Sequence, residues 1–410
     1  MSANTINRRR LLGTAGTSAL LWAVGGTGPA RAGEPFRIGA LNPITGAGSL
    51  YGTGMQKAII FSAEEVNAAG GAGGRMLEVF PEDSQTQPDA GVLAAKRLIE
   101  VKKVHAIMGT WSSGVALAVM PIQEAAGVIH MTSAGASIIS TQDKKDLVYR
   151  FSTTGQRSGR AIAKILAQDG VQRVATMAFN NASGRDITDG VKGAWTEMGR
   201  KLVAEVVYEP NRPSYRSELQ RVLAGKPEAI VLGAYVPDTT IIVREAWQLN
   251  AKVRFIGPGY AVSPKLVESL GPEVAEGLMA VDYVSALNGA AFTHFAERYR
   301  KVVGGDPADG FFAACAYDMV QAAALAIEAA GGSTDNAAIA AKLREVANPP
   351  GTPVSSFAEG KALLKAGQKV NYEGASGPLD FDEHGDVRPL FKLSVIRKGQ
   401  LEFRQMLDLK

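Results

Sequence analysis

The sequence predicts an α/β protein with two doubly wound parallel-sheet lobes, and three observations support this prediction. Short apolar, β-branched runs alternate with helix-length segments from residue 36 to about residue 258. The alternation starts again after residue 155, which gives two units of similar size. At 410 residues, the chain also exceeds the usual size of a single core. Strand–helix alternation is typical of parallel sheets that are covered by helices on both faces.

Four strand-like runs and three helix-like segments make up the first unit. The expected strands are FRIGAL, MLEVFPED, HAIMG and VIHMT. The helices between them are expected at 54–69, 88–101 and 115–126. The ligands of such sheets bind beyond the carboxyl ends of the strands, so the loops that follow these runs are the first place to search for function.

The second unit repeats the pattern, and a C-terminal tail follows it. Its expected strands are VATMAF, LVAEVVYE, AIVLGAY and VRFIG, with helices at 159–169, 186–199, 215–224 and 238–249. In the tail we expect helices at 291–303, 311–330 and 336–346, then an irregular loop, NPPGTPVSSFAEG, within a segment at 348–376. The last two strands, FKLSVIRKG and LEFRQM, flank Gly399.

Residues 1–32 have the layout of an export signal peptide. Three arginines at 8–10 precede a short apolar run at 11–24, and Ala-Arg-Ala at 30–32 supplies a cleavage signal. Paired arginines indicate the twin-arginine route, so we expect a periplasmic protein that is cleaved after Ala32. A membrane anchor is disfavoured, because the run is shorter than the roughly 20 residues that a span requires.

Charge and composition exclude several classes of partner and chemistry. The signal segment holds four basic residues and no acidic ones, which leaves 40 basic residues against 40 acidic ones. No basic footprint for nucleic acid or for a membrane surface remains. Cys315 is the one cysteine, so no intramolecular disulfide can form, and we expect it to be a buried structural thiol.

Motifs for catalysis and for cofactors are missing from the sequence. The four histidines are scattered, and no H-x-x-x-H or C-x-x-C spacing supports a metal site. The glycine-rich stretches GAGSLYG and GPGYAV lack the third glycine of a dinucleotide-binding loop. We therefore expect no cofactor, no metal and no enzyme activity, with an exported enzyme as the alternative.

Two clusters of small and hydroxylic residues follow neighbouring predicted strands. The first is Trp111, Ser112, Ser113 and Gly114, and the second consists of Ser133, Ala134, Gly135, Ala136 and Ser137. A serine at a helix N-cap can simply satisfy the first N–H groups of its own helix. Alternatively, free N–H groups at a helix N-terminus bind a carboxylate. Two such clusters at one sheet edge favour a pocket for a small anionic or zwitterionic ligand.

Longer segments carry a resemblance to a known family. They are IGALNPITGAGSLYGTGMQKAIIFSAEEVNAAGG, MLEVFPEDSQTQP, IMGTWSSGVALAVMPIQEAAGVIHMTSAGAS and ASGPLDFDEHGDV. In order and spacing they are similar to the substrate-binding proteins of ABC importers of the branched-chain amino acid type, over nearly all of residues 36–410. The resemblance implies the type I periplasmic-binding (Venus-flytrap) fold, with lobe I at 36–153 plus 285–391 and lobe II at 154–284 plus 392–410. Three hinge strands are expected near residues 153, 284 and 391.

The resemblance also implies a role for several residues of this sequence. Ser113 takes the place of the serine that binds a ligand carboxylate, and Ala134 takes that of a carbonyl that accepts from a ligand ammonium. Tyr51, Tyr235 and Tyr317 take the places of aromatic residues that line the cleft. Trp111 and Tyr260 would add an aromatic surface, although Trp111 could instead cover the core below its strand.

Three departures from the family pattern affect recognition of an ammonium group. Ala136, beside Ser137, stands where amino-acid binders carry a threonine. Ser183 replaces a second-lobe tyrosine, and Gly259 stands where an acidic residue would pair with the ammonium. Since a buried ammonium without a counter-charge is costly, we expect a carboxylate with an uncharged aromatic or aliphatic body. A branched-chain amino acid, another amino acid or an amide is the alternative ligand.

The resemblance implies transport by hinge closure. The lobes would close over the ligand, and the closed form would then dock on an inner-membrane ABC permease with its ATPase. A monomer is expected. A periplasmic sensor lobe that reports the ligand to a signalling partner is the alternative role.

Overall fold

The computed structural model describes residues 33–407 and 409, so the predicted signal peptide lies outside the described residues. Within this part of the chain, the first sheet has five parallel strands in the order β2-β1-β3-β4-β5. The strands are β1 (Phe36–Asn42), β2 (Leu77–Asp83), β3 (Ala106–Thr110), β4 (Ile129–Thr132) and β5 (Val148–Arg150).

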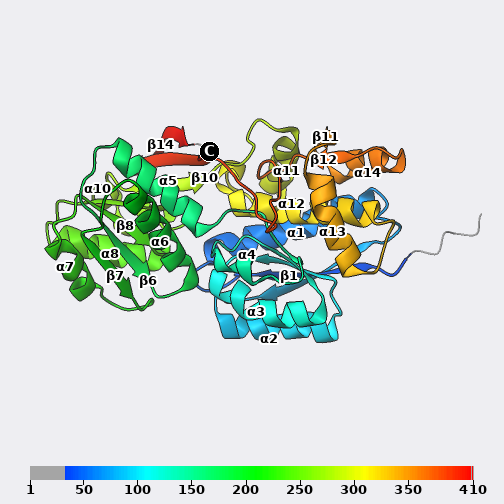
Figure 1. Ribbon diagram of the computed structural model, residues 1–410, viewed down its shortest axis with the longest axis horizontal. Helices are drawn as coiled ribbons and strands as arrows, with labels where there is room; N and C mark the ends of the chain where they lie inside the picture. Colours follow the sequence, from blue (N-terminus) through cyan, green and yellow to red (C-terminus); the bar gives the residue numbers. More distant parts are fainter. Residues whose placement is uncertain (1–32, 408, 410) are drawn as a thin grey trace, which may run out of the picture. The chain divides into compact units, whose positions relative to one another are not determined.

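Helices cover both faces of this first sheet (Figure 1). One face carries α1 (Ser49–Ala68), α12 (Phe311–Ala329) and α13 (Asn336–Ala347), and the other carries α2 (Pro88–Lys96) and α3 (Ser113–Ala126). In the described residues α12 is long and apolar enough to cross a membrane, but 94% of its apolar window is buried. Its composition reflects its place in the core between α1 and α13. We refer to the first sheet and these helices as the first lobe.

The second sheet has five parallel strands and an antiparallel hairpin at its edge, in the order β14-β13-β10-β9-β8-β6-β7. The strands are β6 (Val174–Phe179), β7 (Ala204–Tyr208), β8 (Ala229–Gly233), β9 (Arg254–Pro258), β10 (Met279–Tyr283), β13 (Phe391–Arg397) and β14 (Gln400–Leu407). The helices around it are α5 (Gly155–Gln168), α6 (Ala182–Glu197), α7 (Arg216–Ala224), α8 (Val236–Gln248), α9 (Pro264–Leu270) and α10 (Pro272–Ala275). These elements form the second lobe.

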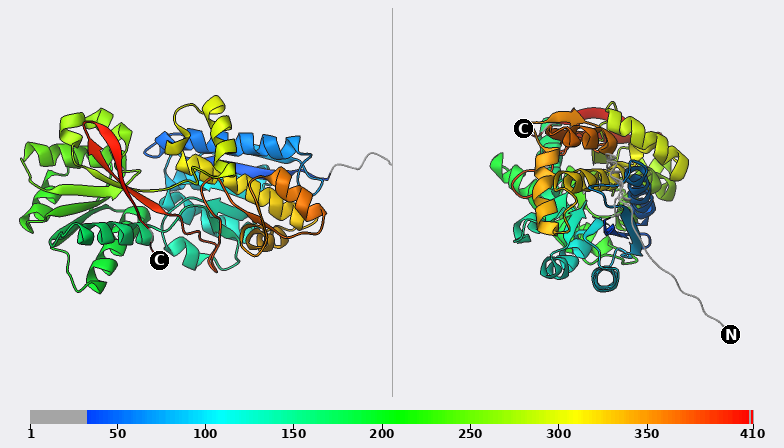
Figure 2. Two further views of the ribbon diagram at one scale, coloured as in Figure 1. Left: turned by 90° about the horizontal axis from the view of Figure 1, so that it is seen from above. Right: turned by 90° about the vertical axis from the view of Figure 1, so that its right-hand side faces the viewer.

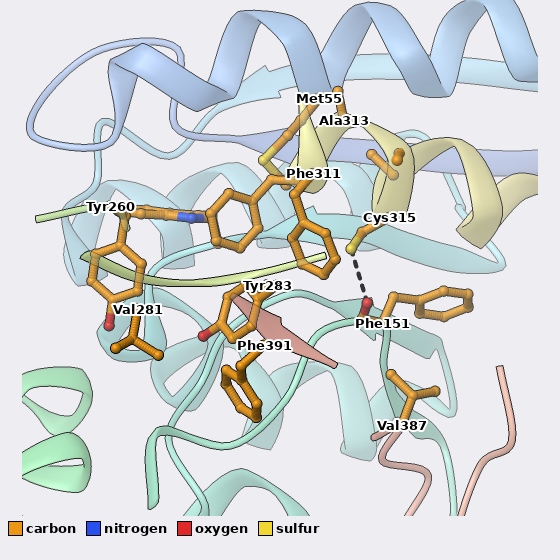
Figure 3. Packing of buried hydrophobic residues seen from close by; sticks show 14 of the residues in the cluster. Met55, Phe151, Tyr260, Val281, Tyr283, Phe311, Ala313, Cys315, Val387 and Phe391 are labelled. Atoms are coloured by element: carbon orange, nitrogen blue, oxygen red, sulfur yellow. Dashed lines mark hydrogen bonds between the residues drawn. The ribbon is translucent and has the colours of Figure 1, made fainter. Parts of the chain in front are cut away.

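The chain passes between the two lobes three times, after β5, after β10 and before β13. The third passage leads into the hairpin β13–β14, which lies in the second lobe (Figure 2). An apolar core lies at these passages. Tyr283 packs against Phe311 and Phe391, with ring centroids 4.9 and 5.7 Å apart (Figure 3). The thiol of Cys315 is buried, as predicted, and donates to the carbonyl of Phe151 over 2.8 Å.

Short elements and the tail differ most from the predicted ones. The expected strands of both units are confirmed, and β5 and β10 lie close to the hinge strands expected near residues 153 and 284, but α4 (Ile138–Gln142), α9 and α10 were not predicted. The expectation of an irregular loop at 348–360 is wrong. Here β11 (Thr352–Val354) pairs in parallel with β12 (Val370–Tyr372), and α14 (Phe357–Lys365) connects them. This pairing joins residues that are distant in sequence, so a local pattern does not show it. The tail also includes α11 (Ala290–Val302).

Candidate functional site

The two predicted clusters lie together at the carboxyl ends of β3 and β4. Strands β3 and β4 are parallel neighbours, so the loops that follow them meet. The N–H of Ala136 donates to Ser113 Oγ over 3.0 Å, which joins one cluster to the other. Ser112 is the N-cap residue of α3, but its side chain makes no capping hydrogen bond. Ser112 therefore does not cap its own helix through its side chain.

Four aromatic side chains, two from each lobe, converge on Trp111. Its ring centroid lies 5.3 Å from Tyr51 and 5.9 Å from Phe312, both in the first lobe. On the second lobe it lies 4.9 Å from Tyr235 and 5.8 Å from Tyr260. Trp111, Tyr235 and Tyr260 are buried, and burial raises the pKa of Tyr235 to about 12. We call these five residues the aromatic cluster.

Serines surround the aromatic cluster on its polar side. Ser183, at the start of α6, approaches the hydroxyl of Tyr260 to 3.3 Å. A small cavity is lined by Ser133, Gly135, Gly155 and Ser183, by Tyr283 and by all rings of the aromatic cluster except Tyr51. Its volume is about 10 Å³, on the order of the space for one water molecule. The lobes are thus closed on each other here, and a ligand enters only if they separate or the rings move.

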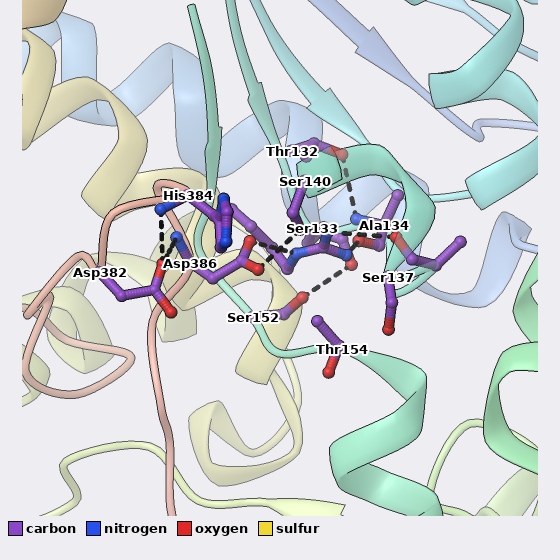
Figure 4. A network of polar contacts seen from close by, with 12 residues as sticks. Thr132, Ser133, Ala134, Ser137, Ser140, Ser152, Thr154, Asp382, His384 and Asp386 are labelled. Atoms are coloured by element: carbon purple, nitrogen blue, oxygen red, sulfur yellow. Dashed lines mark hydrogen bonds and ion pairs between the residues drawn. The ribbon is translucent and has the colours of Figure 1, made fainter. Parts of the chain in front are cut away.

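The carbonyl of Ala134, expected to accept from a ligand ammonium, is bonded to the buried guanidinium of Arg150. Nη1 of Arg150 donates to it, and Nη2 donates to the Ala136 carbonyl and to Ser140 Oγ, over 3.1 and 2.7 Å. Nε donates to Asp386 Oδ1 over 2.7 Å. Figure 4 shows this network between the 132–140 segment and the 382–386 turn. The Arg150–Asp386 ion pair therefore lies behind the second cluster.

Ser137 contacts the other lobe through Asp186 of α6. Both its N–H and its hydroxyl donate to Asp186 Oδ2, over 3.0 and 2.9 Å. The N–H of Gln156 donates to the same oxygen over 3.1 Å. Burial raises the pKa of Asp186, and these hydrogen bonds oppose that shift. Ser137, which lies in the loop expected to contact the ligand, thus holds a carboxylate of the chain itself.

Two predicted positions lie elsewhere. The expectation that Tyr317 lines the cleft is wrong, because its ring is fully buried against Phe61 and Phe295 and its hydroxyl donates to Glu65. Phe312, on the same helix, contacts Trp111 in its place. Gly259 lines a larger groove, which Tyr51 also lines, rather than the small cavity.

Sequence reasoning missed Arg150, Asp186, Tyr283 and Phe312. Three of them lie in apolar or helical segments without any local motif, and only Arg150 gives a signal, as a charge inside the apolar run VYRF. In the part of the chain that the structure describes, no group of three or more His, Cys, Asp or Glu side chains could hold a metal ion. His105 Nδ1 accepts from the Arg37 N–H, and His130 Nε2 lies 2.6 Å from Thr110 Oγ1.

Comparison with known proteins agrees with this architecture. The family model of periplasmic binding proteins matches residues 35–390. The chemotactic signal transduction substrate-binding protein BasB of Halobacterium salinarum is 26% identical over 387 residues, which cover 92% of this chain and 90% of BasB.

Two solved structures share the fold. The leucine-binding protein LivK of Thermotoga maritima is 25% identical with a TM-score of 0.78, and the match covers 91% of this chain and 98% of LivK. An ABC-transporter solute-binding protein of Rhodopseudomonas palustris in complex with 3,4-dihydroxybenzoic acid is 23% identical with a TM-score of 0.73, and the match covers 91% and 97%. The predicted fold class is confirmed, and the chain belongs to the periplasmic binding protein family, as a solute-binding protein of the ABC-transporter type.

Proposed function

We propose that this chain is exported to the periplasm, binds a small carboxylate between its lobes and delivers it to an inner-membrane ABC permease with its ATPase. The lobes of this proposal are 36–153 with 285–391 and 154–284 with 392–410. Hinge motion near residues 153, 284 and 391 opens and closes the cleft, and the protein acts as a monomer without chemistry on the ligand. Ligand contacts that exist only in the closed form stabilise closure.

The observation that carries this proposal is the position of the two polar clusters beneath the aromatic cluster. Ser112 and Ser113 begin α3, where N–H groups and the helix dipole favour an anion. The 134–137 loop lies against Ser113, and its Ser137 already holds the Asp186 carboxylate. Ser183, Tyr235 and Tyr260 reach this place from the second lobe. If the carboxylate group of a ligand bound these serines, the aromatic cluster would thus enclose the rest of the ligand.

The Arg150 contacts favour a ligand without an ammonium group. The Ala134 and Ala136 carbonyls, which an ammonium would use, are bonded to a guanidinium. An ammonium at this place would be desolvated without these carbonyls as free acceptors, which is costly. Flat rings such as those of the aromatic cluster suit a planar or apolar ligand body. The related structure with 3,4-dihydroxybenzoic acid supports the same ligand class.

Specific observations also favour the alternatives. LivK is named as a leucine-binding protein, which supports a branched-chain amino acid as the ligand. BasB is named for chemotactic signal transduction, which supports a sensor role instead of import. Uptake of the labelled ligand by cells with and without this protein separates import from sensing.

A thermal-shift series on mature chain 33–410 tests the ligand class. The probes are benzoate, 3,4-dihydroxybenzoate, short aliphatic carboxylates, leucine and benzamide. A ligand at 100 times its Kd adds about 2.7 kcal/mol of stability, which raises the Tm by several degrees. Ser113→Ala should abolish the shift, whereas the exposed control Ser269→Ala should retain it. If leucine raises the Tm and none of the carboxylates without an amino group does, the proposal of a ligand without an ammonium group is refuted.

A further inference from the structure

A second and larger space lies between the lobes beside the aromatic cluster. Its volume is about 900 Å³. The starts of α1 and α12 line it from the first lobe, and β10, β13, β14 and the loop before α9 line it from the second. Phe312 belongs to its wall and to that of the small cavity, so the two spaces are neighbours. We call this space the Asp282 groove.

The walls of the Asp282 groove are largely apolar and aromatic. Tyr51 and Phe312 form one side, at 5.2 Å between ring centroids in an edge-on arrangement. Val262, Leu401 and Phe403 lie on the other side. Phe403 is 62% exposed although it is large and apolar. Such a wall suits the hydrocarbon body of an organic ligand.

The charges in the groove leave a negative surplus. Asp282 of β10 lies directly opposite Lys392 of β13 in the antiparallel register, and Asp309 lines the groove as well. Glu268 pairs with Lys265 over 2.6 Å, so these two compensate each other. Within residues 33–407 and 409, no ion pair within 4.0 Å joins Lys392 to either aspartate. Two carboxylates therefore share one lysine.

The two carboxylates and the aromatic wall line the same groove. Burial raises the pKa of Tyr51, and the negative charges of Asp282 and Asp309 raise it further. Burial raises the pKa of Asp282, and the charge of Lys392 lowers it. A cation placed between these carboxylates and the rings of Tyr51 and Phe312 would gain from both, since aromatic faces attract cations.

We propose that the Asp282 groove is a second binding site, which takes an organic cation with an apolar body, such as an arylalkylamine. Asp282 and Asp309 bind the ammonium group, Tyr51 and Phe312 contact it, and the apolar body lies along Val262, Leu401 and Phe403. This site does not use Ser113 or the 134–137 loop. It shares Tyr51 and Phe312 with the aromatic cluster, so variants at Ser113 and at Asp282 distinguish it from the carboxylate site proposed above.

Calorimetric titration of the mature chain with 2-phenylethylamine tests the proposal, with 2-phenylethanol as the neutral counterpart. We expect the amine to bind at least tenfold more tightly than the alcohol, and Asp282→Asn and Asp309→Asn each to weaken amine binding about tenfold. Lys392→Met should strengthen it, because this change removes the competing cation. Asp189→Asn, an exposed aspartate on α6, is the matched control and should bind as the wild type does.

Several outcomes would overturn the second site. They are no amine binding to the wild type, equal binding of amine and alcohol, or undiminished binding to both aspartate variants. Loss of amine binding in Ser113→Ala together with retention in Asp282→Asn would place the amine at the serines. If Asp282→Asn fails to fold, Asp309→Asn and Lys392→Met decide, since they predict shifts of opposite sign. Benzoate binding in the same variants reports separately on the carboxylate site.

Discussion

The carboxylate of Asp282 occupies the space that a side chain on Gly259 would need. An ideal Cβ on Gly259 would lie 2.2 Å from Asp282 Cγ and 2.7 Å from Asp282 Cβ. The N–H of Gly259 donates to the Val281 carbonyl over 2.9 Å, which holds the two strands at this distance. An acidic group is thus present beside position 259, but it comes from the next strand of the sheet.

Gly259→Ala should destabilise the protein, because the new methyl group displaces Asp282. Overpacking of a close contact typically costs about 1–3 kcal/mol. Urea unfolding of both proteins measures the change in the free energy of unfolding. Gly193→Ala is the control, since a Cβ there meets nothing within 4 Å and the position lies in helix α6. That variant should gain up to about 1 kcal/mol. Unchanged stability of Gly259→Ala would show that Asp282 moves aside freely.

The sequence predicts the regular elements and the two polar clusters but not the contacts between distant segments. Ser113 and the 134–137 loop meet as predicted, because adjacent parallel strands bring their following loops together. Tyr317 was placed wrongly because the apolar residues along α12 give no local sign of which one faces the cleft. Asp282 packs against Gly259, and Asp186 accepts from Ser137. In each pair the two residues belong to different elements, which only folding brings together.

Asp186→Ala should shift the lobes toward an open arrangement. The substitution removes the acceptor for the Ser137 N–H and hydroxyl and for the Gln156 N–H. Buried donors without an acceptor are costly, whereas in an open form water satisfies them. Small-angle X-ray scattering should therefore show a larger radius of gyration for ligand-free Asp186→Ala. The exposed neighbour Asp189→Ala should scatter as the wild type does, and identical profiles for all three proteins would contradict the role of Asp186.

His130 should make the protein acid-sensitive between pH 6.5 and pH 4. Burial lowers its pKa from 6.5 to about 4, with Nε2 at 2.6 Å from Thr110 Oγ1. In this pH range the unfolded chain binds a proton that the folded chain does not, so stability is full above pH 6.5 and falls as the pH falls. The loss amounts to about 3 kcal/mol at pH 4. Urea unfolding from pH 7 to pH 4 should show a shallower decline for His130→Gln, and parallel declines would exclude this group as the cause.

Arg150 and Asp386 should show strong coupling in a double-mutant cycle. Their side chains are 1% and 12% exposed, and the guanidinium also holds the 134–140 segment. Removal of one partner leaves an uncompensated buried charge, so Arg150→Met alone should cost about 3–5 kcal/mol. Adding Asp386→Leu removes that second charge, and the double variant should lose less than the sum of the single losses. Simple additivity, measured by urea unfolding, would show that Arg150 acts through the Ala134 and Ala136 carbonyls rather than through its ion pair.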